Sequence, residues 1–253
     1  MKNHHLSILF FFAISCQSSG TAETNTDPVV IPGNGSLDKI SMIAVEDAEK
    51  SSDPKLNVLD YYQRLKGVYD PGYPIQKRGN KWVSVSPATE EEVEATVDIP
   101  NGFIEVVDEG TGGGTQKVQV VLFRMANGTA VIAVSLQNFD GIDVSQELYF
   151  LRDTPKGLAD WSEHTMPVIT GFDFLPDDYA EEPDVVEEAL SIYFALPRKG
   201  TNVTAMIYTD KKSLYCSQQA TEQQRDLLCP VYGRLVRTAL LLKWDRMEGK
   251  FGL

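Results

Sequence analysis

Two strand-length apolar segments on either side of Asn127-Gly128 constrain the fold more than any other feature of the sequence. Residues 117–125 and 129–137 are rich in β-branched and aromatic side chains, which favour strands. Asn-Gly is typical of a two-residue type I′ turn, because both central residues of that turn need a positive φ. The pattern therefore predicts an antiparallel β-hairpin.

A two-residue turn also predicts which side chains of the hairpin share a face. Phe123 would lie opposite Ile132, and Val121 would lie opposite Val134. Residues directly opposite one another point to the same side of a sheet, so these four would form one buried face. Burial would stabilise the fold by about 1.5–3 kcal/mol for each of them.

The rest of the chain alternates further strands with a few helical segments. Strands are expected at residues 82–85, 103–107, 147–152, 191–196, 201–208, 236–244 and 250–253. A helix is expected over residues 54–66, with Asp53 as its N-cap and Gly67 after its end. The acidic residues of 89–94 suit the N-terminus of another helix. We therefore expect a mainly β (α+β) fold, an antiparallel sheet or meander with a few short helices, in a single β-rich domain at 54–253.

The N-terminal residues have the pattern of a secretion signal. Lys2 precedes the apolar residues 6–14, a run shorter than the roughly 20 residues that cross a bilayer. The small residues before Cys16 resemble the lipobox of bacterial lipoproteins, in which the cysteine carries lipid. We expect a signal peptide at 1–15, lipid on Cys16, and a flexible tether at 16–53. A plain signal peptide before a coincidental cysteine is the alternative.

The charge balance and the signal together indicate location and partners. The net charge of -13 argues against nucleic acid as a partner, because phosphate contacts need a basic face. We expect a cell-envelope protein, periplasmic or surface-exposed, whose first partner is the membrane that holds its lipid. A secreted eukaryotic protein is a further alternative, since Asn34, Asn127 and Asn202 each begin an N-x-[ST] sequon.

Two cysteines remain if Cys16 carries lipid. Cys216 and Cys229 are expected to form a disulfide, because paired cysteines are usual in an oxidising compartment. The bridge would close a loop of about 14 residues and contribute roughly 3 kcal/mol. Two reduced, buried thiols are the alternative.

Acidic side chains concentrate in one loop. Asp173, Asp177, Asp178 and Glu181 are candidate ligands for Ca²⁺, which takes six to eight oxygen atoms from flexible loops. The loop has no EF-hand pattern, and a solvated acidic surface is the alternative. No other cofactor is expected.

Side chains suited to catalysis are scarce. After removal of residues 1–15, His164 is the remaining histidine, and no G-x-S-x-G motif accompanies it. Glu105 with Asp108 or Glu109 could pair as carboxylates, although the spacing does not distinguish them from charges at a strand end. We expect a non-enzymatic binding or accessory module. A carboxylate- or cation-dependent hydrolase of glycans or peptides is the alternative.

Tyrosines concentrate around the first predicted helix. Tyr61, Tyr62, Tyr69 and Tyr73 are candidates for a surface on which a sugar or a protein partner stacks. The ligand would then be a glycan or another envelope protein. Packing in the core, with the hydroxyl groups in water, is the alternative.

Several short segments, taken in order, resemble a family of uncharacterised secreted bacterial proteins and lipoproteins. These segments are residues 59–62, 97–105, 120–124, 196–201 and 241–245. The similarity spans most of residues 56–253, and the stretch at 216–229 departs from it. The resemblance implies an envelope location and a β-rich fold. It implies no activity and transfers no catalytic residue.

Overall fold

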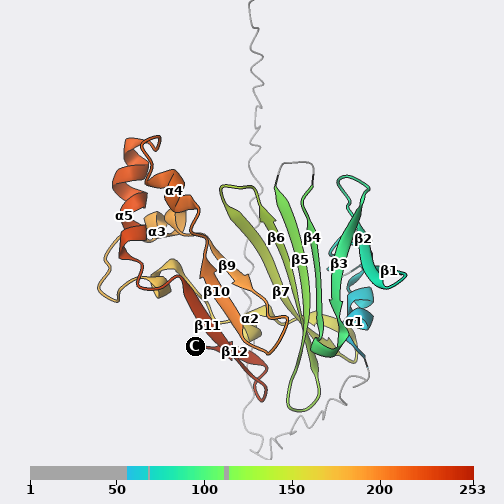
Figure 1. Cartoon of the computed structure of the whole chain (residues 1–253). Coiled ribbons are helices and arrows are strands. Elements are labelled where there is room, and N and C mark those ends of the chain that lie inside the picture. The colour runs from blue at the N-terminus through green and yellow to red at the C-terminus, as the bar shows by residue number, and fades with distance from the viewer. Residues whose placement is uncertain (1–55, 68, 111–113) are drawn as a thin grey trace, which may run out of the picture. The chain divides into compact units, whose positions relative to one another are not determined.

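The strands form two antiparallel sheets. The computed structural model describes residues 56–67, 69–110 and 114–253, and Figure 1 follows the chain through it. In the first sheet eight strands pair in chain order, whereas the second has the order β12-β11-β10-β9. The first sheet contains β1 (Gln76–Arg78), β2 (Lys81–Val85), β3 (Glu92–Asp98), β4 (Phe103–Asp108), β5 (Thr115–Arg124), β6 (Ala130–Phe139), β7 (Val144–Thr154) and β8 (Gly157–Asp160). The second contains β9 (Ile192–Ala195), β10 (Val203–Ile207), β11 (Ala239–Asp245) and β12 (Lys250–Gly252).

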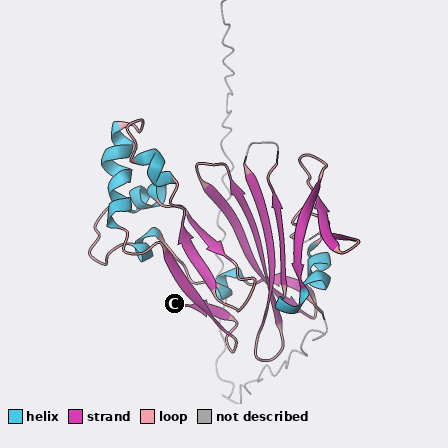
Figure 2. Ribbon diagram, viewed as in Figure 1, coloured by secondary structure: helices cyan, strands magenta, loops and turns pink. Residues whose placement is uncertain are grey.

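The helices are short, as Figure 2 shows. They are α1 (Val58–Leu65), α2 (Ser162–Thr165), α3 (Pro183–Ala189), α4 (Lys211–Tyr215) and α5 (Cys229–Arg234). Single turns of other helix types are η1 (Ile99–Asn101), η2 (Gly171–Phe174) and η3 (Gln224–Leu228). The predicted fold class, mainly β with antiparallel sheets and few helices, is confirmed.

The hairpin at Asn127 forms, but the predicted register was wrong by one residue. Phe123 pairs with Val131, and Val121 pairs with Ala133. Ile132 therefore points to the opposite face of the sheet from Phe123. A shift of one residue in the pairing exchanges the two faces of a strand. The predicted register therefore placed every side chain of β6 on the wrong face of the sheet relative to β5.

The cause of the different register is the turn itself. The backbone N–H of Met125 donates to the carbonyl of Thr129 (2.9 Å), which leaves three residues in the loop instead of two. Gly128, the last of the three, has φ +91°, and the N–H of Thr129 donates to the side chain of Asn127 (3.0 Å). A three-residue loop with a left-handed glycine is the next most common hairpin connection.

Helix α1 begins later than predicted. Its N-cap is Asn57, whose side chain accepts from the N–H of Leu59, while Asp60 accepts from the N–H of Asn57. This reciprocal capping box satisfies backbone donors at the start of the helix. The predicted N-cap, Asp53, lies outside the described residues. Gly67 follows the helix with φ +91°, as expected for a C′ glycine.

The helical start predicted at 89–94 was wrong, because strand β3 begins at Glu92. Val93, Ala95 and Val97 alternate with polar residues, and Ala95 pairs with strands on both sides. Hydrogen bonds to strands on both sides and the packing of an apolar face stabilise these residues as a strand. This exceeds the stabilisation that acidic side chains would give to the N-terminus of a helix.

The eight-stranded sheet is covered on both faces. One face packs against α1 through Val58, Tyr61, Tyr62, Leu65, Ile104, Val120, Ala130, Ile132, Val134 and Leu151. The other face packs against the four-stranded sheet through Phe103, Val121, Phe123, Met125, Val131, Ala133, Phe150, Leu196, Val203, Leu242, Trp244 and Phe251. Alternation along β5 and β6 supplies both clusters, which is why residues 120–123 and 130–134 are apolar at every position.

A glutamine joins the two sheets where β7 meets β9. The Oε1 atom of Gln146 accepts from the N–H of Phe194 (2.7 Å), and its Nε2 atom donates to the carbonyl of Phe194 (2.9 Å). Gln137 donates to the same carbonyl (3.1 Å). The side chain of Gln146 thus pairs with the outer edge of β9 as another strand would, and it covers that edge.

The helices α3, α4 and α5 pack on one end of the second sheet. Their core includes Val186, Tyr215, Val231 and Tyr232 with residues of β10 and β11. A disulfide joins Cys216 to Cys229, with 5.1 Å between the Cα atoms, as predicted.

Candidate functional site

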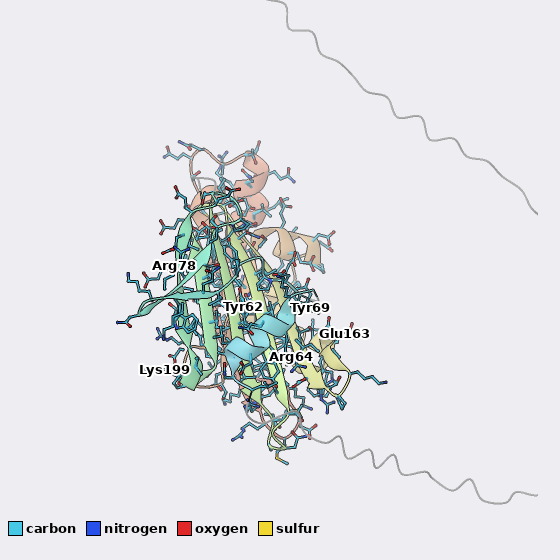
Figure 3. The ribbon with its side chains drawn as sticks, turned by 90° about the vertical axis from the view of Figure 1, so that its right-hand side faces the viewer. Tyr62, Arg64, Tyr69, Arg78, Glu163 and Lys199 are labelled. Atoms are coloured by element: carbon cyan, nitrogen blue, oxygen red, sulfur yellow. A yellow bond between two sulfur atoms is a disulfide. The ribbon has the colours of Figure 1, made fainter. Side chains whose placement is uncertain are left out.

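The tyrosines predicted as a stacking surface divide into two groups. Tyr61, Tyr62 and Tyr73 are buried. Tyr69 is half-buried, and its ring centroid lies 4.7 Å from that of Tyr149. Figure 3 shows Tyr62 and Tyr69 on the side of the molecule that carries α1. Three of the four therefore pack in the core, but their hydroxyl groups bond to Asp153, Tyr73 and Asp108 inside the protein and are not in water as the alternative predicted. Tyr69 pairs with an aromatic residue that the sequence did not single out.

A pocket of about 350 Å³ opens between α1 and the segment that follows it. We call it the α1 pocket. It is lined by Leu59, Tyr62, Gln63, Lys66, Asp70, Pro71, Gly72, Tyr73, Pro74 and Ile75. Most of this lining is apolar or aromatic, with three polar side chains at the rim, which is the usual composition of a small-molecule site.

The local sequence explains why the chain folds back to form this pocket. Asp70 accepts a hydrogen bond from the N–H of Gly72 (2.9 Å), and Gly72 has φ +78°. The hydroxyl of Tyr62 then donates to the carbonyl of Tyr73 (2.6 Å), which ties the returning segment to the helix. Burial, and next the negative charge of Asp70, raise the pKa of Tyr62, so this hydroxyl stays neutral.

Tyr73 connects the returning segment to the sheet. Its hydroxyl lies 2.9 Å from Asp108 Oδ2 and 2.8 Å from Gln116 Oε1. Hydrogen bonds, first from Ser86 and then from the N–H of Gly110 and from Tyr73, lower the pKa of Asp108 despite its burial. Burial and the bond to Asp108 raise the pKa of Tyr73. An ionised carboxylate therefore holds a neutral phenol, and the wall of the pocket is rigidly supported.

A second pocket of about 170 Å³ adjoins the first, with Pro71 and Tyr73 as shared walls. We call it the strand pocket, because it lies over β5, β6 and β7. Its remaining lining consists of Gln116, Lys117, Val118, Leu136, Gln137, Asn138 and Glu147. The sequence pattern did not single out these residues. The available signal was the polar–apolar alternation at the ends of β5 and β6, which becomes informative only with the correct register.

The helix that forms the outer wall is anchored by a buried carboxylate. Asp153 of β7 accepts from the hydroxyl of Tyr61 (2.7 Å) and from Arg64 (3.0 Å), and its side chain is 4% exposed. Arg64 lies on the same face of the molecule as Tyr62 in Figure 3. The α1 pocket is therefore built on a fixed element, as a preformed binding site requires.

The predicted calcium ligands are not brought together. Asp173 accepts from the N–H of Thr170 (2.7 Å) and so caps the turn η2. Within the described ranges, no three His, Cys, Asp or Glu side chains lie close enough to hold a metal ion, and this includes Asp177, Asp178 and Glu181. The structure therefore gives no support to a cation site in this loop.

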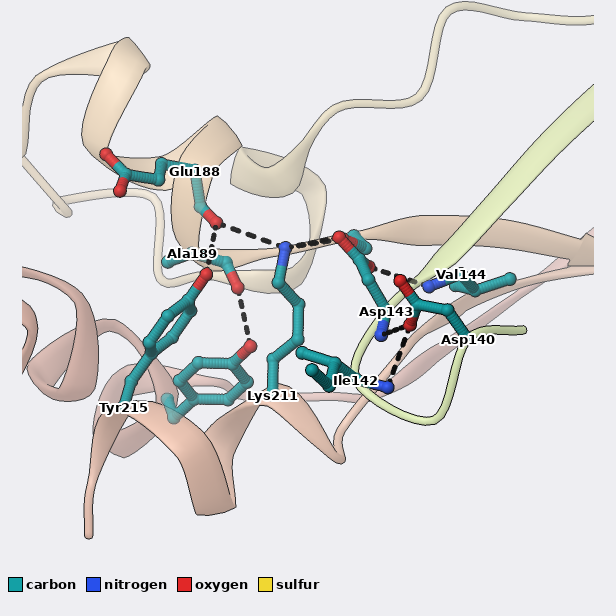
Figure 4. Close-up of polar contacts among 10 residues, drawn as sticks. Asp140, Ile142, Asp143, Val144, Glu188, Ala189, Lys211 and Tyr215 are labelled. Atoms are coloured by element: carbon teal, nitrogen blue, oxygen red, sulfur yellow. Dashed lines mark hydrogen bonds and ion pairs between the residues drawn. The ribbon is translucent and has the colours of Figure 1, made fainter. Parts of the chain in front are cut away.

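Two further acidic residues, Asp140 and Asp143, lie in the β6–β7 turn and are used within the fold (Figure 4). Asp140 accepts from the N–H groups of Ile142 and Asp143 and so closes the β6–β7 turn. Asp143 accepts from the ammonium group of Lys211 (2.8 Å), which also donates to Ser191 (3.0 Å). Burial opposes ionisation of Asp143, but the bonds from Lys211 and Ser191 lower its pKa overall. Asp140 therefore holds the turn, and Asp143 connects that turn to α4 and to the start of β9, so both carboxylates are structural.

The side chains considered for catalysis are also occupied or separated. The ring of His164 stacks on Trp161 with 4.0 Å between centroids, and its Nε2 atom lies 3.0 Å from the carbonyl of Glu248. Glu105 accepts from Gln119 (2.8 Å). Asp108 is three residues further along β4, so it points to the other face and cannot pair with Glu105.

The predicted signal peptide, the lipid site Cys16 and the tether lie outside the described residues. No helix in the described part of the chain is long and apolar enough to cross a bilayer.

No protein-family model and no curated protein matches the chain. Among solved structures, a domain of an uncharacterised protein from Porphyromonas gingivalis W83 aligns with a TM-score of 0.46 and 11% identity, covering 76% of this chain and 85% of that chain. The resemblance to secreted bacterial lipoproteins remains a prediction.

Proposed function

We propose that this protein is a non-enzymatic binding module, held at a membrane of the cell envelope by lipid on Cys16, and that the α1 pocket is its ligand site. The observation that carries the proposal is the pocket itself. At about 350 Å³ it lies within the size range of small-molecule sites, and its walls are preformed.

Two carboxylates that support the pocket walls, Asp108 and Asp153, are engaged in hydrogen bonds and are not arranged for acid–base chemistry. The pKa of Asp108 is lowered by the hydrogen bonds it accepts, so it is a weak base and remains ionised. A catalytic carboxylic acid instead needs a pKa raised toward the working pH. Asp153 is engaged by Arg64 and Tyr61, which fits the support of a wall.

Replacing Gln63 by Trp should abolish ligand binding by filling the mouth of the α1 pocket. Gln63 is exposed at the rim, so the change adds bulk without disturbing the core. The measurement is the melting temperature of the full chain with a panel of neutral and acidic oligosaccharides, short peptides and Ca²⁺. A ligand at about 100 times its Kd should raise the Tm of the parent by roughly 5–10 °C.

The matched control is Gln218→Trp, which introduces the same side chain at an exposed position of the disulfide-bonded segment. It should keep the full shift. The proposal fails if nothing in the panel shifts the parent, or if Gln63→Trp retains the shift.

Cys16→Ser should release the protein from membranes, because the hydroxyl cannot form the thioether that holds the lipid. The measurement is fractionation of cells that express the full chain, with Ser18→Ala as the control that keeps the cysteine. Continued retention of Cys16→Ser in the membrane fraction contradicts the lipid anchor but leaves the pocket proposal standing.

A further inference from the structure

The polar side chains of the strand pocket form a row across neighbouring strands. Gln116 of β5 pairs with Asn138 of β6, which pairs with Ser145 of β7. Directly paired residues share a face, so these three side chains lie side by side on strands about 4.8 Å apart. The row ends at Asp108, the partner of Gln116 on β4, which is already held by Tyr73.

Two amides in this row are available to a ligand. Gln116 is exposed, and its Oε1 atom lies 2.8 Å from the Tyr73 hydroxyl, so the Nε2 side of the amide faces away from Tyr73. Asn138 is exposed, and among the described residues its side chain has no hydrogen-bond partner. An amide both donates and accepts, so this pair matches a ligand whose hydroxyl groups do the same.

We propose that the α1 pocket and the strand pocket together take a neutral oligosaccharide chain, an inference that rests on the binding function proposed above. A sugar ring has polar edges and a less polar face. Val118 and Leu136 give the strand pocket an apolar floor, and the amides lie at its edge. Pro71 and Tyr73 line both pockets, so the two pockets are adjacent and the α1 pocket would take a second sugar unit.

The charges around the two pockets favour an uncharged ligand. Glu147 lies at the strand pocket, and Asp70 and Lys66 lie at the α1 pocket. The side chain of Lys117 points to the opposite face of β5, over the ring of Phe139, so the rims have no excess of positive charge. The whole chain has a net charge of -13, which repels a polyanion. An acidic polysaccharide therefore fits less well than a neutral one.

The position of the strand pocket also favours a glycan over a peptide. Peptides commonly bind a sheet by pairing with an exposed edge strand. The strands under this pocket are β5, β6 and β7, each of which pairs with a neighbour on both sides. The backbone groups of these strands are already paired, so a ligand at this pocket is bound by side chains, which can donate to and accept from sugar hydroxyls.

The test is calorimetric titration of the detergent-solubilised full chain with neutral gluco-, manno- and xylo-hexasaccharides, an oligogalacturonate and a lysine-containing hexapeptide. At least one neutral hexasaccharide should bind. Asn138→Ala should weaken that binding about tenfold, equivalent to about 1.4 kcal/mol, without changing the Tm. Gln63→Trp should weaken it as well, and Gln218→Ala, an exposed amide far along the chain, should have no effect.

The outcomes separate this inference from the binding function on which it rests. Binding of the oligogalacturonate or the peptide alone, with sensitivity to Gln63→Trp, overturns the ligand class and leaves a binding module. Neutral glycan binding that ignores Asn138→Ala overturns the assigned site. Failure of every probe to bind overturns the glycan inference, and absence of any shift in the broader thermal panel rejects the binding function itself.

Discussion

Replacing Phe123 by Ala should lower the free energy of unfolding by about 3–5 kcal/mol, the range measured for buried aromatic residues. Phe123 is 1% exposed, and its ring centroid lies 5.2 Å from Trp244 and 5.3 Å from Phe251. These partners belong to the second sheet, so the cavity would open at the contact between the sheets. Urea unfolding of the parent and the variant measures the difference.

The control for this substitution is Leu241→Ala. Leu241 lies on the outer face of β11 and is 51% exposed, so its loss should change the stability by no more than about 0.5 kcal/mol. Equal effects of the two substitutions would mean that the sheets do not pack through Phe123.

Replacing Lys211 by Met should cost about 2–3 kcal/mol of unfolding free energy. The side chain of Lys211 is 10% exposed, and its removal takes the ammonium donor away from both Asp143 and Ser191. Breaking a fully buried pair costs about 3–5 kcal/mol, but Asp143 is 39% exposed and water compensates part of the loss. Lys212→Met is the matched control, since Lys212 is the adjacent, exposed lysine.

The same pair predicts an acid-dependent contribution to stability. The folded-state pKa of Asp143 lies below its ordinary value of 3.8, so its contribution is present above that value and is lost as the pH falls through the folded-state pKa. The gap in stability between the parent and Lys211→Met should therefore narrow in that acidic range. A gap that stays constant between pH 6 and about pH 2 would contradict the charge pairing.

The register of one hairpin decided how much of the candidate site the sequence could predict. The two-residue turn pairs Gln116 with Phe139, whereas the three-residue turn pairs it with Asn138. With the predicted register, the two amides point to opposite faces and no polar row exists. The bond from Met125 to Thr129 that sets the register depends on local turn geometry, which the Asn-Gly pair does not determine uniquely.

Other parts of the site depend on contacts that are distant in sequence. Tyr73 is 35 residues from Asp108, and nothing near either residue indicates that they meet. The first helix presents Tyr62 to Tyr73 only because its buried face packs on β5 and β6. By contrast, the disulfide was predictable, since only Cys216 and Cys229 remained once Cys16 was assigned to lipid.

The sequence by itself determined most of the strands, although not β1, β3 or β8, and that the fold is an antiparallel, mainly β one. Those properties follow from local alternation, β-branched side chains and turn residues, which act within a few positions of each other. Only the tertiary structure decided which faces of the strands are buried. It also brought Tyr73, Gln116 and Asn138 next to one another. Long-range pairing sets these relationships, because a shift of one residue in a strand exchanges its two faces while its local sequence stays the same.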